Sequence, residues 1–87
     1  ISVSAVGSLK TDLEPGKFVI VDQFIDRTFS RKKTFFDEEI VGHVSMAEPT
    51  SFGLSNCCEA ALKKLNINNQ KGGTYVVMEG PQFSTLA

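Results

Sequence analysis

A helical pattern that lies between β-rich runs constrains the fold of this chain more than any other feature. The apolar residues of this pattern recur at the spacing of one helix face: Leu54, Cys58, Ala61, Leu62 and Leu65. Polar and charged residues occupy the opposite side. Thr50 or Ser51 can cap the start of the helix. Asn66 or Asn68 can cap its end, so the pattern predicts one well-bounded amphipathic helix.

Four other segments have the composition of strands. Ile1–Val6 alternates weakly and resembles a buried strand that enters a loop. Lys17–Asp22 holds four apolar residues between charges, and Pro15-Gly16 before it supplies the residues of a type II turn. Ile40–Met46 is a weaker candidate. Thr74–Met78 follows the helix and is rich in β-forming residues.

The order of these elements predicts an α/β fold. A helix that precedes the last strand gives the crossover needed for parallel pairing. The polar stretch Asp26–Glu39 is long for a loop in a compact domain, and such loops are often functional or flexible. Eighty-seven residues form one small domain at most.

Composition excludes several classes of protein. With 41% hydrophobic and 22% charged residues, the chain is neither disordered nor collagen-like. Its net charge of −1 offers no field to attract nucleic acid or an anionic membrane, and no apolar run is long enough to span one. The adjacent Cys57-Cys58 cannot close an ordinary disulfide in a helix, and two free thiols fit a reducing cytosol. With His43 as the single histidine, no zinc spacing exists, and no metal site is expected.

The two ends of the sequence indicate an excerpt of a longer chain. The sequence begins at Ile1, without Met, inside a predicted strand. It stops at Ala87, just after a loop that resembles part of a binding site. Neither end has the polar composition of a natural terminus, so we expect both to be truncated.

Two predicted strand ends are suited to ligand binding, because ligands of open α/β sheets gather at the carboxyl ends of strands. Ser4-Ala5 offers a hydroxyl and a small residue that lets the backbone approach an anion, although such residues more often form a tight turn. After the last strand, Gly80-Pro81 presents Phe83, which can stack on a flat heterocycle. The neighbouring Ser84 can hydrogen-bond a base edge or sugar. On composition alone, Phe83 is more often a core residue.

The remaining candidates are weaker. His43 lies in an apolar stretch without triad or metal partners, which favours a structural or substrate-shaping role over acid–base catalysis. Arg31-Lys32-Lys33, set among phenylalanines, has some features of an RNA-binding patch. Asp37-Glu38-Glu39 offsets its charge, so a solvated loop is favoured and no nucleic-acid partner is expected.

Five motifs in order, spread over nearly all 87 residues, resemble those of methylthioadenosine phosphorylases, in the trimeric branch of the purine nucleoside phosphorylase superfamily. They are Ser4-Ala5-Val6-Gly7-Ser8-Leu9, Pro15-Gly16, Asp22-Gln23-Phe24-Ile25-Asp26-Arg27-Thr28, His43-Val44-Ser45-Met46-Ala47-Glu48-Pro49 and Glu79-Gly80-Pro81-Gln82-Phe83-Ser84-Thr85. The resemblance implies a mixed twisted sheet flanked by helices. Residues 1–87 would then be the central part of a single nucleoside phosphorylase domain.

The resemblance also implies roles for individual residues. Ser4 and Ala5 match positions that give phosphate a hydroxyl and a backbone amide. Phe83 matches an aromatic ring that packs on the purine. Ser84 stands where phosphorylases of guanine and hypoxanthine nucleosides carry Glu, which favours the adenine branch. His43 matches a residue that lines the 5'-substituent pocket of the neighbouring subunit.

The implied reaction is phosphorolysis of 5'-methylthioadenosine to adenine and 5-methylthioribose 1-phosphate, so the enzyme is a pentosyltransferase of purine and methionine salvage. Phosphate is the co-substrate, and no cofactor is implied. The resemblance further implies a homotrimer in the cytoplasm, with the nucleus left open. The alternatives are a phosphorylase of inosine or guanosine and a non-catalytic purine-binding relative.

Part of the implied machinery lies outside this sequence. The family's purine-binding aspartate falls beyond Ala87, so the segment contains no catalytic residue, and the family's N-terminal glycine-rich phosphate loop is also absent. We therefore expect residues 1–87 alone to be inactive. Gln82 and Leu86 depart from the family, which often has arginine at both positions. These departures bear on the packing of the loop and on substrate preference.

Overall fold

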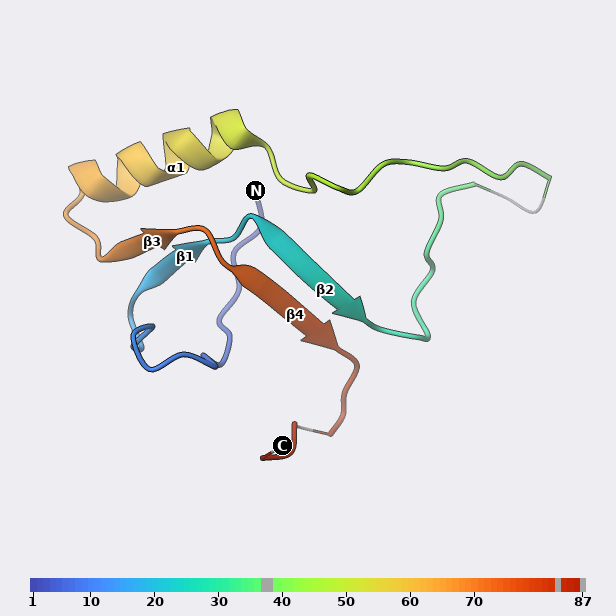
Figure 1. Ribbon diagram of the computed structural model, residues 1–87, viewed down its shortest axis with the longest axis horizontal. Helices are drawn as coiled ribbons and strands as arrows, with labels where there is room; N and C mark the ends of the chain where they lie inside the picture. Colours follow the sequence, from blue (N-terminus) through green and yellow to red (C-terminus); the bar gives the residue numbers. More distant parts are fainter. Residues whose placement is uncertain (37–38, 83, 87) are drawn as a thin grey trace.

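The computed structural model describes residues 1–36, 39–82 and 84–86. Its elements, shown in Figure 1, are β1 (Phe18–Ile20), β2 (Gln23–Arg27), α1 (Phe52–Lys64), β3 (Asn69–Lys71) and β4 (Thr74–Met78). β1 pairs with β3 and β2 pairs with β4, and both pairs are parallel. α1 packs against β1 and β3 and provides the crossover between them. The predicted α/β arrangement with a helical crossover is thereby confirmed.

The start of α1 is fixed by Ser51. Its hydroxyl accepts a hydrogen bond from the amide of Leu54 at 3.3 Å, which satisfies one of the unpaired amides of the first turn. On the helix surface, Lys63 donates to Glu59 at 2.6 Å, one turn earlier. Lys63 and Lys64 also place positive charge in the last turn, where the helix dipole favours it.

The end of α1 is a Schellman motif. Asn66 has a φ of 53°, and its amide donates to the carbonyl of Lys63 at 3.0 Å. The amide of Ile67 reaches back to the carbonyl of Leu62 at 2.9 Å. Leu62 and Ile67 are both half-buried, as the hydrophobic contact of this motif requires. Of the two predicted caps, Asn66 is the one used.

The predicted type II turn precedes β1. Gly16 has a φ of 90°, which suits the third position of this turn. The amide of Lys17 donates to the carbonyl of Glu14 at 3.2 Å and closes the turn. Lys17 also donates its ammonium to the carbonyl of Asp12 at 3.0 Å, so the turn is tied to the preceding segment.

The two strand pairs are halves of one longer parallel pair. Phe18 faces Asn69 at the start of β1, and Arg27 faces Met78 at the end of β2, without an inserted residue on either side. Val21-Asp22 and Gly72-Gly73 form the step between the halves. Because the step has the same number of residues in both segments, the register continues across the bend.

Hydrogen bonds hold the bend. The amide of Gly72 donates to the carbonyl of Ile20 at 2.9 Å, and the amide of Asp22 donates to the carbonyl of Gly73 at 3.1 Å. The carboxylate of Asp22 accepts from the amide of Gly73 at 3.0 Å. Gly72 and Gly73 have φ values of 88° and 143°, which residues with side chains rarely adopt. The glycine pair therefore permits both segments of the strand pair to bend together.

Several sequence-based predictions of strands are wrong. Ile1–Val6 and Ile40–Met46 form no strand in the structure. A strand is stable only when another strand accepts its backbone hydrogen bonds, and neither segment has such a partner among the described residues. Gln23–Arg27 is a strand although its ends are polar, so the connection after it starts at Thr28 and not at Asp26. The short polar Asn69–Lys71 is also a strand that the sequence did not indicate.

The described residues do not enclose a hydrophobic core. None of their hydrophobic side chains is buried, and Ile25 in β2 and Met78 in β4 are 52% and 54% exposed. The radius of gyration is 15.9 Å, whereas a compact domain of this length has one of about 12 Å. In Figure 1, the segment between β2 and α1 extends far from the strands. Apolar side chains of the strand pair are therefore accessible.

Candidate functional site

The carboxyl ends of β2 and β4 lie side by side, which is where an α/β sheet places its ligands. Arg27 and Met78 are the last paired residues, and a loop leaves each strand beyond them. Glu79, the first residue after β4, accepts the amide hydrogen of Ser30 with both carboxylate oxygens at 3.0 Å. The loop that carries Ser84 is thus joined to the loop that follows β2.

The turn after β2 is organised by Asp26. One carboxylate oxygen accepts from the amide of Thr28 at 2.8 Å, and the other accepts from the ammonium of Lys33 at 2.5 Å. Lys33 also donates to the hydroxyl of Thr28 at 2.6 Å. The hydrogen bond from Lys33, followed by those from Thr28, holds the pKa of Asp26 well below its ordinary value. Asp26 is therefore an acceptor and not a proton donor near neutral pH.

The described residues among the predicted site residues lie on three separate segments of the chain. Ser4 and Ala5 are exposed on a segment without helix or strand, and Ser84 is exposed beyond β4. Phe83 lies outside the described residues. Within the part of the chain that the structure describes, no hydrogen bond joins Ser4, His43 and Ser84 to one another. Their roles remain predictions.

His43 lines a hollow of about 610 Å³ beside the end of β2. The hollow combines aromatic and apolar side chains with one ion pair; its lining is Phe24, Asp26, Lys33, Thr34, Phe35, Phe36, Gly42, His43, Val44 and Met46. The ring of Phe36 lies close against Gly42, where a Cβ would meet it. His43 itself is exposed and borders this largely apolar surface.

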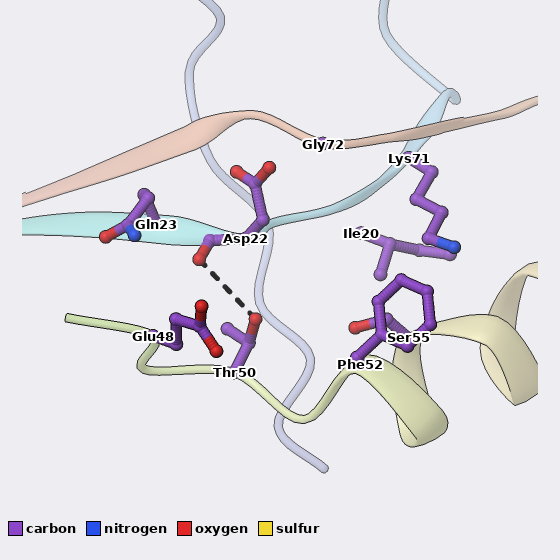
Figure 2. A pocket seen from close by; sticks show the side chains of 9 residues that line it. All are labelled: Ile20, Asp22, Gln23, Glu48, Thr50, Phe52, Ser55, Lys71 and Gly72. Atoms are coloured by element: carbon purple, nitrogen blue, oxygen red, sulfur yellow. Dashed lines mark hydrogen bonds between the residues drawn. The ribbon is translucent and has the colours of Figure 1, made fainter. Parts of the chain in front are cut away.

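A second hollow, of about 460 Å³, lies at the bend of the strand pair and is drawn in Figure 2. Its lining comes from both strands, the chain before α1 and the first turns of α1: Ile20, Asp22, Gln23, Glu48, Thr50, Phe52, Ser55, Lys71 and Gly72. The hydroxyl of Thr50 donates to the carbonyl of Asp22 at 3.4 Å. The side chain of Gln23 donates to the carbonyl of Ala47 at 2.9 Å. These contacts attach the chain before α1 to the bend.

Lys71 closes one side of this second hollow. Its ammonium lies 5.0 Å from the centre of the Phe52 ring, a cation–π distance. Lys71 also pairs with Glu59 at 3.3 Å and donates to the side chain of Asn56. Lys63 and then Lys71 lower the pKa of Glu59. The positive charge of Lys71 is therefore used in contacts with α1.

Within residues 1–36, 39–82 and 84–86, no three His, Cys, Asp or Glu side chains come close enough together to hold a metal ion. Cys57 is exposed and Cys58 half-buried, and both are free thiols. In the same residues, α1 is too short and too polar to cross a membrane.

The family model of the phosphorylase superfamily matches residues 1–87, the whole chain. The chain belongs to the phosphorylase superfamily. The predicted resemblance to methylthioadenosine phosphorylases is confirmed by individual members as well. S-methyl-5'-thioadenosine phosphorylase of Rhodospirillum rubrum is 62% identical over 87 residues, which are all of this chain and 30% of the relative. The protein of the same name in Saccharolobus solfataricus is 53% identical over the same length, 32% of that relative.

A solved structure supports the superfamily fold. The methylthioadenosine phosphorylase of Schistosoma mansoni, in complex with tubercidin, matches with a TM-score of 0.83 and 32% identity. The match covers 91% of this chain and 36% of that one. The predicted α/β fold of nucleoside phosphorylase type is therefore confirmed. This member of the superfamily spans about a third of the length of the relatives it matches.

Sequence reasoning missed three contributors to this region: Glu79, Asp26 and the amide of Ser30. Glu79 opens a motif in which the sequence indicated binding roles for Phe83 and Ser84 only. Ser30 acts through its backbone, so its residue type gives no signal. Asp26 comes two residues before Thr28, which is the spacing of an Asx turn and the one local sign of its contact.

Proposed function

We propose that the protein catalyses phosphorolysis of 5'-methylthioadenosine to adenine and 5-methylthioribose 1-phosphate. One observation carries this proposal: the chain is 62% identical to the S-methyl-5'-thioadenosine phosphorylase of Rhodospirillum rubrum over all 87 residues. The aligned range includes the loop after β4. In the proposed domain, residues 1–87 form the central part of a single nucleoside phosphorylase unit. The protein would act as a homotrimer in the cytoplasm, with phosphate as co-substrate and without a cofactor.

The chemistry requires an anion site, a platform for the purine and a proton donor. A phosphate oxygen attacks the anomeric carbon of the ribose, and the bond from that carbon to the purine nitrogen breaks. The electron pair of the broken bond leaves with adenine, which takes up a proton. Since positive charge develops on the ribose and negative charge on the purine, fixed hydrogen-bond donors and close positioning supply much of the rate.

The proposed roles follow the motifs. The hydroxyl of Ser4 and the amide of Ala5 donate to phosphate, and Phe83 packs on the purine. Ser84 favours adenine because a serine has no carboxylate to hold a 6-oxopurine edge. His43 borders a hollow with Phe36 and Met46, and this apolar environment suits the methylthio group of a nucleoside in the neighbouring subunit.

The deciding experiment compares three nucleosides with the full-length protein. Methylthioadenosine, adenosine and inosine are each incubated with and without phosphate, and the released base is quantified by chromatography. We expect phosphate-dependent release of adenine, fastest from methylthioadenosine. Preference for inosine would contradict the role of Ser84. Binding of methylthioadenosine without any release would identify a non-catalytic purine-binding relative.

A further inference from the structure

The contact between Glu79 and Ser30 is not used by any role assigned so far. We propose that Glu79 is a positioning residue for the nucleoside. By accepting the amide hydrogen of Ser30, it holds the chain that leaves β4 against the turn after β2 and so helps to place Ser84 for the purine. This inference rests on the proposed function, because it assigns Glu79 a part in the same site.

The position of Glu79 supports this role. The paired ladder of β2 and β4 ends at Arg27 and Met78, so the two loops beyond it lack ladder hydrogen bonds to one another. Glu79 is half-buried and comes directly after the ladder. Both of its carboxylate oxygens accept from the amide of Ser30 at 3.0 Å. This contact connects the two segments beyond the last residues that the ladder pairs.

The partner of Glu79 is itself held in place. In sequence, Ser30 lies between Thr28 and Lys33, and both of these residues donate to the carboxylate of Asp26. Asp26 is on β2, so the turn is anchored to the strand pair at one end. Contacts therefore run from β2 through the turn to Glu79 and on to the loop that carries Ser84. A loop held from both strands loses less conformational entropy when a ligand binds.

The charge of Glu79 also fits a positioning role better than a surface role. A carboxylate accepts a backbone hydrogen bond more strongly than a neutral group does. Among the described residues, no Lys or Arg forms a salt bridge with Glu79. Its contact with the amide is thus not the by-product of a surface ion pair.

The test uses the full-length protein with Glu79→Ala and Glu79→Gln. Glu79→Ala removes both acceptor oxygens, and we expect KM for methylthioadenosine to rise about five- to tenfold. KM for phosphate should stay within about twofold, because among the described residues no hydrogen bond joins Glu79 to Ser4 or Ala5. Glu79→Gln keeps the volume and one acceptor oxygen. Its KM for methylthioadenosine should therefore lie between those of Glu79→Ala and the unsubstituted protein. Glu14→Ala, an exposed carboxylate at the turn before β1, serves as the matched control.

A second measurement follows the contact itself. Hydrogen–deuterium exchange of the peptide that contains Ser30 should be faster in Glu79→Ala than in the unsubstituted protein, and unchanged in Glu14→Ala. This readout does not depend on activity. It therefore tests the hydrogen bond even where a variant turns over slowly.

The outcomes separate the two proposals. If the unsubstituted protein releases no adenine, the proposed function is wrong, and the role of Glu79 in nucleoside binding falls with it. If the protein is active and Glu79→Ala changes neither KM, the positioning role alone is wrong. A fall in kcat with both KM values unchanged would show that Glu79 only stabilises the fold, and would also overturn the inference.

Discussion

The carboxylate of Asp22 accepts a hydrogen bond from the amide of Gly73, 3.0 Å away, where the parallel strand pair bends. The two residues are far apart in sequence and belong to the two different segments of the strand pair. Asp22 also uses its backbone, since its amide donates to the carbonyl of Gly73. Asp22 and Gly73 thus make two of the hydrogen bonds that hold the step between the two halves of the strand pair, beside the one from Gly72 to Ile20.

Replacing Asp22 should weaken the bend. Asp22→Ala leaves the amide of Gly73 without its acceptor, and we expect the free energy of unfolding to fall by about 1–2 kcal/mol. Asp22→Asn retains an acceptor oxygen and should cost less. Urea denaturation of the full-length protein measures the change, with Asp12→Ala as the control. A value for Asp22→Ala no larger than that of the control would contradict the role of this contact.

The pKa of Asp26 should depend on Lys33. In the folded protein the pKa is well below 3.8, so the contacts of the carboxylate stabilise the fold fully above about pH 5. This stabilisation is lost as the pH falls through the lower folded value. Lys33→Met should raise the pKa toward 3.8, whereas Lys32→Met should not. Carbon-detected NMR titration of the Asp26 carboxyl measures both variants, and equal pKa values would contradict the ion pair.

Ser84 should control the choice of purine if the proposed function holds. Ser84→Glu introduces a carboxylate that can hold a 6-oxopurine, so preference should move from methylthioadenosine toward inosine. We expect the ratio of kcat/KM for the two substrates to fall by about tenfold or more. Thr85→Glu adds the same charge one residue later and is the control. An unchanged ratio in Ser84→Glu would remove Ser84 from the site.

Residues 1–87 prepared alone should not catalyse phosphorolysis. No hydrophobic side chain of the described residues is buried, so the isolated chain lacks the core that holds a site in place. Its urea denaturation, followed by circular dichroism, should be broad rather than cooperative. Turnover of methylthioadenosine by this chain would contradict both the expectation and the assignment of site residues.

Local signals explain which parts of the fold could be predicted. Ser51, the apolar face of α1 and Asn66 act within a few residues of one another, and the helix was predicted close to its observed bounds. The type II turn at Pro15-Gly16 is equally local. Thr74–Met78 is a strand over its whole predicted range because it is rich in β-forming residues.

The missed elements depend on partners far along the chain. Asn69–Lys71 is polar throughout, and only its pairing with β1 makes it a strand. Ile1–Val6 shows the reverse, since a suitable composition forms no strand where no partner is present among the described residues. The link from Glu79 to Ser30 joins two segments through a backbone amide. Every residue except proline carries a backbone amide, so the residue type of Ser30 could not indicate this contact.

The shared register across the bend makes the length of the Gly72-Gly73 step as important as its composition. One added or deleted residue there would turn every side chain of β4 to the opposite face of the sheet. It would also shift Glu79 by one residue relative to Ser30. Homologous proteins that conserve the purine loop should therefore conserve the length of this step as strictly as its two glycines.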